Sequence, residues 1–222
     1  MRTETGLGVL HLFCKPAGSV DREAVGAALK AVEAAEGQVV TAAVLGHKCD
    51  IAVMALHPDW AVLRSLQSGL QAAGLEVVDS YVSITEVSEY AKGMPEHMLR
   101  ERLHPVLPPA GKPVFCFYPM TKRREAHANW YATPFAERDA MMREHGKSGR
   151  TFAGKVVQLI TGSTGLDDFE WGVTLFATTP EVVKDVVYTM RFDKGSALYG
   201  EFGRFYVGYL AVVGDVLDGL GR

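Results

Sequence analysis

Apolar and polar positions alternate along this chain with two periods, one typical of strands and one typical of helices. In the first half, short apolar runs between turn residues predict strands, and longer segments with apolar residues three and four positions apart predict helices. Pro58 begins the second of these helices and Gly74 ends it. The order is strand, helix, strand, strand, helix, strand, over residues 7–14, 21–36, 38–46, 50–57, 58–74 and 76–87.

The second half repeats this order after a connector that is rich in charge and proline. Thr133 and Pro134 are expected to start its first helix, which Gly146 ends, and Thr179 and Pro180 are expected to start its second. Its strands are expected over residues 113–118, 154–161, 169–177 and 203–213. Few residues are identical between the halves, so the repeat is one of pattern.

This repeated order is the ferredoxin-like supersecondary pattern, which belongs to the α+β class. We therefore predict an N-terminal half over 1–92, a connector over 93–112 and a C-terminal half over 113–222. Two such sheets can pair edge to edge or curl into a barrel, which protects their open edges. The space between a sheet and its helices is then a natural place for a ligand.

Composition narrows the class of protein. With 222 residues, 48% hydrophobic residues and a net charge of −3, the chain is expected to be globular and lacks the basic surplus of nucleic-acid binders. No apolar run approaches the roughly 20 residues that a membrane-spanning helix needs, and the N-terminus is typical of a strand rather than a signal peptide. The widely spaced cysteines, without a CxxC pair, are expected to be buried thiols of a cytoplasmic protein: Cys14, Cys49 and Cys116.

Two polar residues fall on faces that the pattern predicts to be apolar. Gln158 shares a strand face with Val156 and Ile160, so its amide either bonds the backbone or points into a cavity, and spacing alone does not decide. His145 follows two methionines by three and four residues, at the end of a predicted helix. A core or capping histidine is the commoner case, whereas a neutral imidazole would suit the axial position of a haem iron.

A phenol stands at the end of an apolar strand and is followed at once by positive charge. Tyr118 precedes three cations at residues 122–124, and a solvated basic turn is the commoner meaning of such a run. Because Arg150 and Arg191 stand at two other element ends, the cations could instead converge on a ligand with several carboxylates. The phenol is neutral at pH 7, can donate a hydrogen bond and can also be oxidised to a radical.

Several stretches carry a resemblance when they are taken together: YPMTKRR (118–124), NWY (129–131), EHGKSGR (144–150), GKVVQLITGSTGLDDFEWGVTLF (154–176) and YTMRFDKGSALYGEFGRFYVG (188–208). They resemble the chlorite-dismutase-like haem protein family, and within it the coproheme decarboxylase branch. The first half resembles this family more loosely, through GVLHLF, VLGHKCDIAVMALHP and SYVSITEVSEY. It departs from the family pattern by being shorter around the first helix and by the CKPAG that follows the first strand, and in the second half NWY is followed by AT.

The resemblance implies a dimeric α+β barrel made of two ferredoxin-like halves, a homopentamer, and a haem-type ligand in the C-terminal half. It implies removal of CO₂ from two propionates of iron coproporphyrin III (coproheme) with hydrogen peroxide, through a tyrosyl radical, to give haem b. Iron coproporphyrin III is then both substrate and cofactor, and haem b is the product. A general haem peroxidase and a haem or coproheme carrier without turnover stay open as alternatives.

The resemblance also implies roles for individual residues. His145 in EHG matches the proximal iron ligand, and Tyr118 in YPM matches the tyrosine that becomes the radical. Lys122 matches the lysine beside the reactive propionate, and Gln158 matches the distal glutamine. Because a glutamine is neutral, unlike the distal arginine of chlorite-degrading relatives, chlorite chemistry is not expected. The other expected ligand contacts are Met120, Arg150, Arg191 and Ser196 and, by a looser match, Arg102, Tyr81 and Ser83.

Overall fold

The computed structural model describes residues 1–91 and 93–220. The predicted domain boundary at residue 92 and the end of the C-terminal half, at residues 221–222, lie outside the described residues. The elements, in chain order, are β1 (Gly8–Pro16), α1 (Arg22–Ala34), β2 (Gln38–Val44), β3 (Ile51–His57), α2 (Trp60–Ala72), β4 (Leu75–Thr85), α3 (Glu96–Leu103), β5 (Val114–Lys122), β6 (Arg124–Glu125), β7 (Ala128–Asn129), α4 (Phe135–Arg150), β8 (Val156–Gly162), β9 (Trp171–Ala177), α5 (Pro180–Met190), α6 (Lys194–Ala197), β10 (Gly200–Phe202), β11 (Tyr206–Leu210) and α7 (Val213–Gly219). The molecule is a mixed α+β fold around a large antiparallel sheet.

The strands pair in a ring. Their order is β5, β11, β2, β3, β1, β4, β8 and β9, and β9 pairs back onto β5. All of these pairings are antiparallel. Each strand of the ring therefore has a partner on both sides, which removes the exposed edges of an open sheet. The short strand β10 pairs outside the ring with the end of β5.

Side chains alternate across the ring and divide the apolar residues into an inner and an outer set. On β5, Phe115 and Phe117 join an inner cluster with Phe13 and Tyr206. Their chain neighbours Cys116 and Tyr118 point the other way and belong to an outer cluster. This is the period of two that strand geometry imposes, and it places Tyr118 on the face turned toward the helices.

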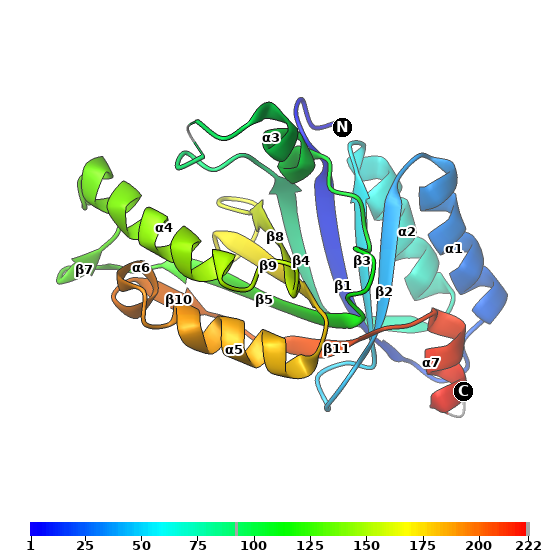
Figure 1. Ribbon diagram of the computed structural model, residues 1–222. Helices are drawn as coiled ribbons and strands as arrows, with labels where there is room; N and C mark the ends of the chain where they lie inside the picture. Colours follow the sequence, from blue (N-terminus) through cyan, green and yellow to red (C-terminus); the bar gives the residue numbers. More distant parts are fainter. Residues whose placement is uncertain (92, 221–222) are drawn as a thin grey trace.

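The helices cover the outer faces of the two halves unequally (Figure 1). In the N-terminal half, α1 and α2 bury one apolar stripe each, which includes Val25 and Val32 of α1 and Leu66 and Leu70 of α2. In the C-terminal half, α5 buries Val183, Val186 and Met190 in the same way. Helix α4 differs, because none of its 16 residues is buried and its main neighbours are α5 and α6.

Helix α4 departs from the expected boundaries at both ends. It does not stop at Gly146 but continues to Arg150. At its start, the Thr133 hydroxyl donates to the carbonyl of Asn129 at 2.9 Å and does not cap the helix. The predicted cap and the predicted end were therefore wrong, and at the start the Thr133 hydroxyl bonds the preceding turn instead of the helix.

Several short elements carry no clear signal in the sequence. Helix α3 forms within the predicted connector, but none of its residues is buried, so it has no apolar stripe to detect. The hairpin of β6 and β7 is made of strands of two residues each. The strand expected over 203–213 covers only Tyr206–Leu210, and helix α7 begins at Val213. Within the described residues, no helix has the length and apolarity that are needed to cross a membrane.

Closure of the ring depends on a close approach between β11 and β2. Gly208 lies opposite Val44 in this pairing, and a Cβ added to Gly208 would collide with the carbonyl oxygen of Ala43. We expect Gly208→Ala to lower the free energy of unfolding by about 1–3 kcal/mol, because the two backbones must separate. Gly26 lies on α1, and nothing lies within 4 Å of a Cβ added there. Gly26→Ala should therefore raise the free energy of unfolding by about 0.5–1 kcal/mol. Urea unfolding of both variants measures the difference, and equal effects would contradict this account.

His11 is a polar exception in the inner cluster. It is 1% exposed, its Nε2 lies 3.0 Å from the Thr174 hydroxyl oxygen, and its ring centroid is 4.2 Å from that of Phe117. Burial lowers the pKa of His11 to about 3, because the charged imidazole would lose its hydration. The ring is therefore neutral in the folded protein over the range in which an unfolded histidine takes up a proton, near pH 6.5.

This burial predicts acid sensitivity. As pH falls below 6.5, the unfolded chain binds a proton at His11 that the folded chain does not, so stability is lost. Between pH 7 and pH 5 this loss amounts to about 2 kcal/mol for a group with a folded pKa of about 3. Denaturant titrations at both pH values should show the loss in the wild type and a smaller loss in His11→Gln. Phe13→Leu, a destabilising change in the same cluster, should keep the wild-type pH dependence.

Candidate functional site

The outer face of β5 carries Tyr118, Met120 and Lys122 in one row. Tyr118 is 6% exposed and stacks on Phe205 with ring centroids 4.4 Å apart, while Phe202 meets it edge-on at 5.8 Å. Burial raises the pKa of Tyr118 above the ordinary value of a phenol. The hydroxyl therefore keeps its proton at neutral pH, within a wall of aromatic rings.

Lys122 is a buried cation with few partners. Its side chain donates from Nζ to the carbonyl oxygen of Gly195 at 2.6 Å, and Nζ lies 4.6 Å from the ring centroid of Trp130. Burial lowers the pKa of Lys122 to about 8, and the carboxylate of Glu170 opposes this effect. The group is still cationic at pH 7, and an ammonium has three donors, so it can bind a further acceptor.

His145 faces the same region from α4. Its Nδ1 lies 3.1 Å from one carboxylate oxygen of Asp193, and the Ser148 hydroxyl donates to the other at 2.6 Å. Burial lowers the pKa of His145, the Lys122 cation lowers it further, and Asp193 opposes both. A neutral ring that donates from Nδ1 to Asp193 leaves the lone pair of Nε2 available, and Nε2 has no hydrogen-bond partner among the described residues.

Gln158 lies on the same face of the sheet, two strands away from β5. Gln158 lies opposite Leu175 of β9, which lies opposite Cys116 of β5, so these three residues form one row across the strands. Ile160, Val173 and Tyr118 form the next row in the same way. Gln158 is half-buried and Ile160 is 42% exposed, although both belong to the sheet. Helix α4 buries none of its own residues either, so Ile160 of the sheet and the half-buried Met141 and Met142 of α4 all keep exposed apolar surface.

Two more predicted contacts lie at this face, and a third lies at its margin. The Arg191 guanidinium is 4.9 Å from the ring centroid of Phe202, which is the ring that meets Tyr118 edge-on. Ser196 follows Gly195, whose carbonyl accepts from Lys122, so the short helix α6 borders the site. Arg150 ends α4 and is exposed, and its guanidinium makes no hydrogen bond or ion pair within the described residues.

Other residues expected at the site lie elsewhere. The phenol of Tyr81 bonds the Ser163 hydroxyl within the inner cluster, and the Ser83 hydroxyl bonds Thr161 at 2.8 Å, so both are turned away from Tyr118. Arg102 is exposed on α3 and has no polar partner among the described residues. Two cations of the basic run do not point toward Tyr118 with Lys122. Arg123 pairs with Glu201 at 3.3 Å, and Arg124 is exposed.

Sequence reasoning missed the residues that hold the expected ones in place. Asp193 orients His145 from a segment 48 residues away, and Gly195 acts only through its backbone carbonyl. Asp193 lies two residues after Arg191, inside a stretch that was singled out for other reasons. Trp130 stands in the NWY stretch, but nothing in its spacing connects it with Lys122.

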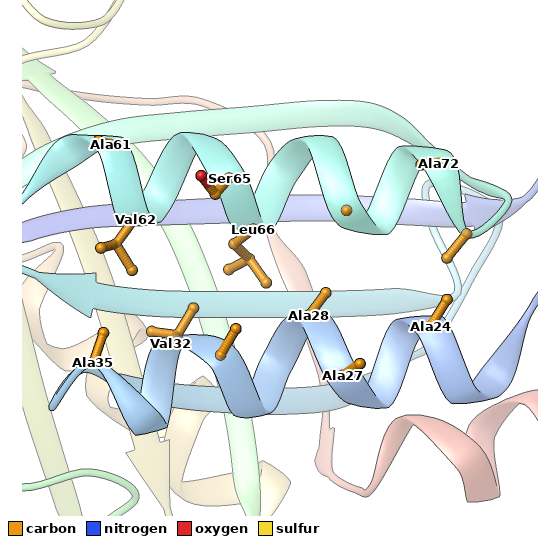
Figure 2. Close-up of a pocket in the computed structure, with 13 residues that line it drawn as sticks. Ala24, Ala27, Ala28, Val32, Ala35, Ala61, Val62, Ser65, Leu66 and Ala72 are labelled. Atoms are coloured by element: carbon orange, nitrogen blue, oxygen red, sulfur yellow. The ribbon is translucent and has the colours of Figure 1, made fainter.

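Two grooves lie among the described residues, one away from this site and one beside it. The first, of about 610 Å³, runs between α1 and α2, and Figure 2 shows that small side chains of the two helices point into it. Its lining is mostly alanine, without a titratable side chain, so it offers no chemistry for catalysis. The second, of about 480 Å³, adjoins the site at Glu170, which accepts from the Lys122 N–H, and is lined by Glu86, Arg124, Asn129, Tyr131, Thr164, Glu170 and Trp171. Within the described residues, no cluster of three or more His, Cys, Asp or Glu side chains could hold a metal ion alone.

Comparison with known proteins gives consistent matches. The sequence model described as chlorite dismutase matches residues 21–211. A coproheme decarboxylase of Staphylococcus saprophyticus is 43% identical over 187 residues, which are 79% of this chain and 74% of that protein. A protein of Natronomonas pharaonis whose name describes heme binding is 44% identical over 193 residues, 79% of this chain but only 32% of that longer protein. A solved structure of a heme-binding protein from Thermus thermophilus has a TM-score of 0.84 and 36% identity, and the match covers 98% of this chain and 96% of that one.

The contact between Asp193 and His145 predicts a titration. Because the Asp193 carboxylate raises the pKa of His145, Asp193→Asn should lower that pKa further. The imidazole signals of His145 in NMR spectra recorded across pH report its midpoint. Ser148→Ala, which leaves the carboxylate in place, is the matched control and should move the midpoint less. A midpoint that rises in Asp193→Asn would show that the carboxylate does not favour the charged ring.

Proposed function

Because this chain belongs to the chlorite dismutase family, we propose that it is a coproheme decarboxylase that converts iron coproporphyrin III to haem b. Hydrogen peroxide is the oxidant, and two propionate side chains become vinyl groups. For each of them, a propionate, one peroxide molecule and one proton give a vinyl group, CO₂ and two molecules of water. The observation that carries this proposal is the row on β5, where a buried, protonated Tyr118 lies four residues from a buried cation, Lys122.

The donor set fits an iron porphyrin. His145 offers a single neutral nitrogen, Nε2, which suits an iron whose other ligands come from a macrocycle. The apolar surface that Ile160, at 42% exposure, and the half-buried Met141 and Met142 leave open suits a flat ring. Lys122, Arg191 and Ser196 border this surface and suit the carboxylates of the substrate. A bound iron porphyrin supplies, together with peroxide, the oxidising equivalents for the reaction.

Three residues of this chain have separate roles in the proposed reaction. His145, held by Asp193, fixes the height and tilt of the substrate. Lys122 pairs with the carboxylate of the propionate that is to react, and thereby brings the β-carbon of that side chain toward Tyr118. Tyr118 gives up an electron and its proton, and the resulting tyrosyl radical takes a hydrogen atom from the β-carbon, which restores the phenol. Loss of a second electron from the propionate then releases CO₂ and leaves the vinyl group.

The proposal extends to the assembly of the protein. We propose that the ring of strands is a dimeric α+β barrel made of two ferredoxin-like halves, and the order of elements in each half supports this. Three free, buried cysteines fit the cytoplasm, where thiols stay reduced. The homopentamer stays a prediction that rests on the family resemblance. The neutral Gln158 fits peroxide as the oxidant better than chlorite, because it supplies no charge to hold an oxyanion.

Tyr118→Phe tests the radical step. The change removes the oxidisable hydroxyl and keeps the ring that packs on Phe205, so the porphyrin should still bind while conversion falls by more than about 100-fold. Purified protein is mixed with iron coproporphyrin III, peroxide is added in small portions, and mass spectrometry follows the loss of two CO₂ units. Tyr188→Phe, at a tyrosine that is 63% exposed on α5, is the matched control and should convert the substrate normally.

Three other outcomes would contradict the proposal in different ways. Full conversion by Tyr118→Phe would show that the radical does not form on Tyr118. An unchanged porphyrin mass in the wild type, with rapid oxidation of an added dye, would favour a general haem peroxidase. Binding without either reaction would favour a carrier.

A further inference from the structure

Glu170 is a buried carboxylate beside Lys122 that the proposed mechanism does not use. It precedes β9, is 6% exposed, and accepts a hydrogen bond from the backbone N–H of Lys122 at 3.0 Å. Its own backbone N–H donates to the carbonyl of Met120 at 3.1 Å, and its carbonyl accepts from the N–H of Ser163 at 2.8 Å. Three hydrogen bonds thus tie this residue to the end of β5 and to the turn between β8 and β9. It forms no ion pair within the described residues, which is unusual for a buried carboxylate.

We propose that Glu170 is a positioning residue, whose negative charge keeps the Lys122 ammonium charged and ready for the carboxylate of the substrate. This inference rests on the proposed function, since the partner that it assigns to Lys122 is a propionate of a porphyrin. It assigns to Glu170 no contact with the substrate and no proton transfer.

The surroundings of Lys122 explain why a separate negative charge is needed. Its Nζ meets a neutral carbonyl, at Gly195, and a neutral aromatic ring, at Trp130. Among the titratable groups nearby, Tyr118 of the same strand keeps its proton, and the imidazole of His145 on α4 is biased toward the neutral form. The carboxylate of Asp193, before α6, is already shared by His145 and the Ser148 hydroxyl.

Asp193 is therefore engaged by His145, whereas Glu170 bonds the Lys122 N–H and forms no ion pair within the described residues. Its side chain also interacts with the phenol of Tyr131, which keeps its proton because burial and Glu170 itself raise its pKa. Arg124, which lines the same groove as Glu170, is exposed and forms no ion pair within the described residues. The charge of Glu170 therefore acts mainly on Lys122, and it opposes the loss of hydration that lowers the pKa of Lys122.

The sign of the effect follows. A lysine is charged below its pKa, and burial has brought this pKa to about 8. Without the charge of Glu170 the pKa falls further, so the ammonium is lost at a pH closer to neutrality. A carboxylate ligand that pairs with Lys122 should then begin to dissociate at a lower pH than it does from the wild type.

Glu170→Gln isolates this charge from the hydrogen bonds. The amide oxygen of glutamine can still accept from the Lys122 N–H, so the backbone of β5 keeps its support. Glu33→Gln, on the exposed surface of α1, makes the same change of net charge far from the site. Glu170→Asp keeps the charge on a shorter side chain and should recover part of the wild-type behaviour.

The first measurement needs no ligand. The ¹³Cε signal of Lys122, assigned by its absence in Lys122→Met, is followed by NMR across pH in the ligand-free protein. We expect a midpoint near 8 in the wild type and in Glu33→Gln, and a midpoint lower by at least about half a unit in Glu170→Gln. If Glu170→Gln merely lowers the thermal stability and leaves the midpoint unchanged, the residue has a structural role only and the inference is overturned.

The second measurement links the charge to the ligand. Binding of metal-free coproporphyrin III is followed by its fluorescence across pH in the wild type, Glu170→Gln, Lys122→Met and the double variant. As pH is raised, the affinity should begin to fall at a lower pH in Glu170→Gln than in the wild type. In the Lys122→Met background, Glu170→Gln should have no further effect. Equal effects of Glu170→Gln in both backgrounds would overturn the inference.

The two measurements separate this inference from the proposed function. If the wild type binds no porphyrin, or binds it without any dependence on Lys122, the proposed function fails, while the first measurement still decides whether Glu170 sets the charge of Lys122. If porphyrin binding depends on Lys122 but its pH profile ignores Glu170, the proposed function stands and this inference fails.

Discussion

Closure of the strands into a ring fixes which side chains of β5 face the core and which face the helices. A shift of one residue in its pairing would exchange Phe117 for Tyr118 and move the phenol into the inner cluster. β5 cannot shift easily, because β9 and β11 hold it on both sides and β10 adds pairs at its end. The positions of Tyr118 and Lys122 on one outer face therefore depend on the whole ring and not on their own segment.

Within that frame, the site balances charges that burial would otherwise make unfavourable. Lys122 and Asp193 are 7% and 5% exposed, and a buried charge is tolerated only with partners. The partners here do not pair the two charges directly, since Lys122 bonds Gly195 and Asp193 bonds His145 and Ser148. The ammonium nevertheless lowers the pKa of His145. The same cation that suits a carboxylate thus adds to the effect of burial, which favours the neutral imidazole, the form that binds a metal.

The sequence predicts the frame and the reactive groups better than it predicts their supports. Periodicity gave the order of elements in both halves, because it reports which face of each element is buried. The common face of Tyr118 and Lys122 follows from their spacing of four along one strand. Asp193, Gly195 and Glu170 act through contacts between segments far apart in the chain, such as the 73 residues between Lys122 and Gly195, and no local pattern records these contacts. Tyr81 is the opposite case. The family resemblance implied a ligand contact for it, whereas the alternation of side chains along β4 places its phenol in the inner cluster.

Helix α4 shows how an open site can be part of a stable fold. A helix of 16 residues usually gains most of its stability from an apolar face that it buries, yet α4 buries none of its residues. Met141 and Met142 lie beside His145 and are only half-buried, while α5 and α6 hold the helix from the side. A flat apolar ligand placed between α4 and the sheet would bury these side chains and supply the missing contacts. Binding and the local stability of α4 are then coupled, because a ligand that binds only the folded form stabilises it.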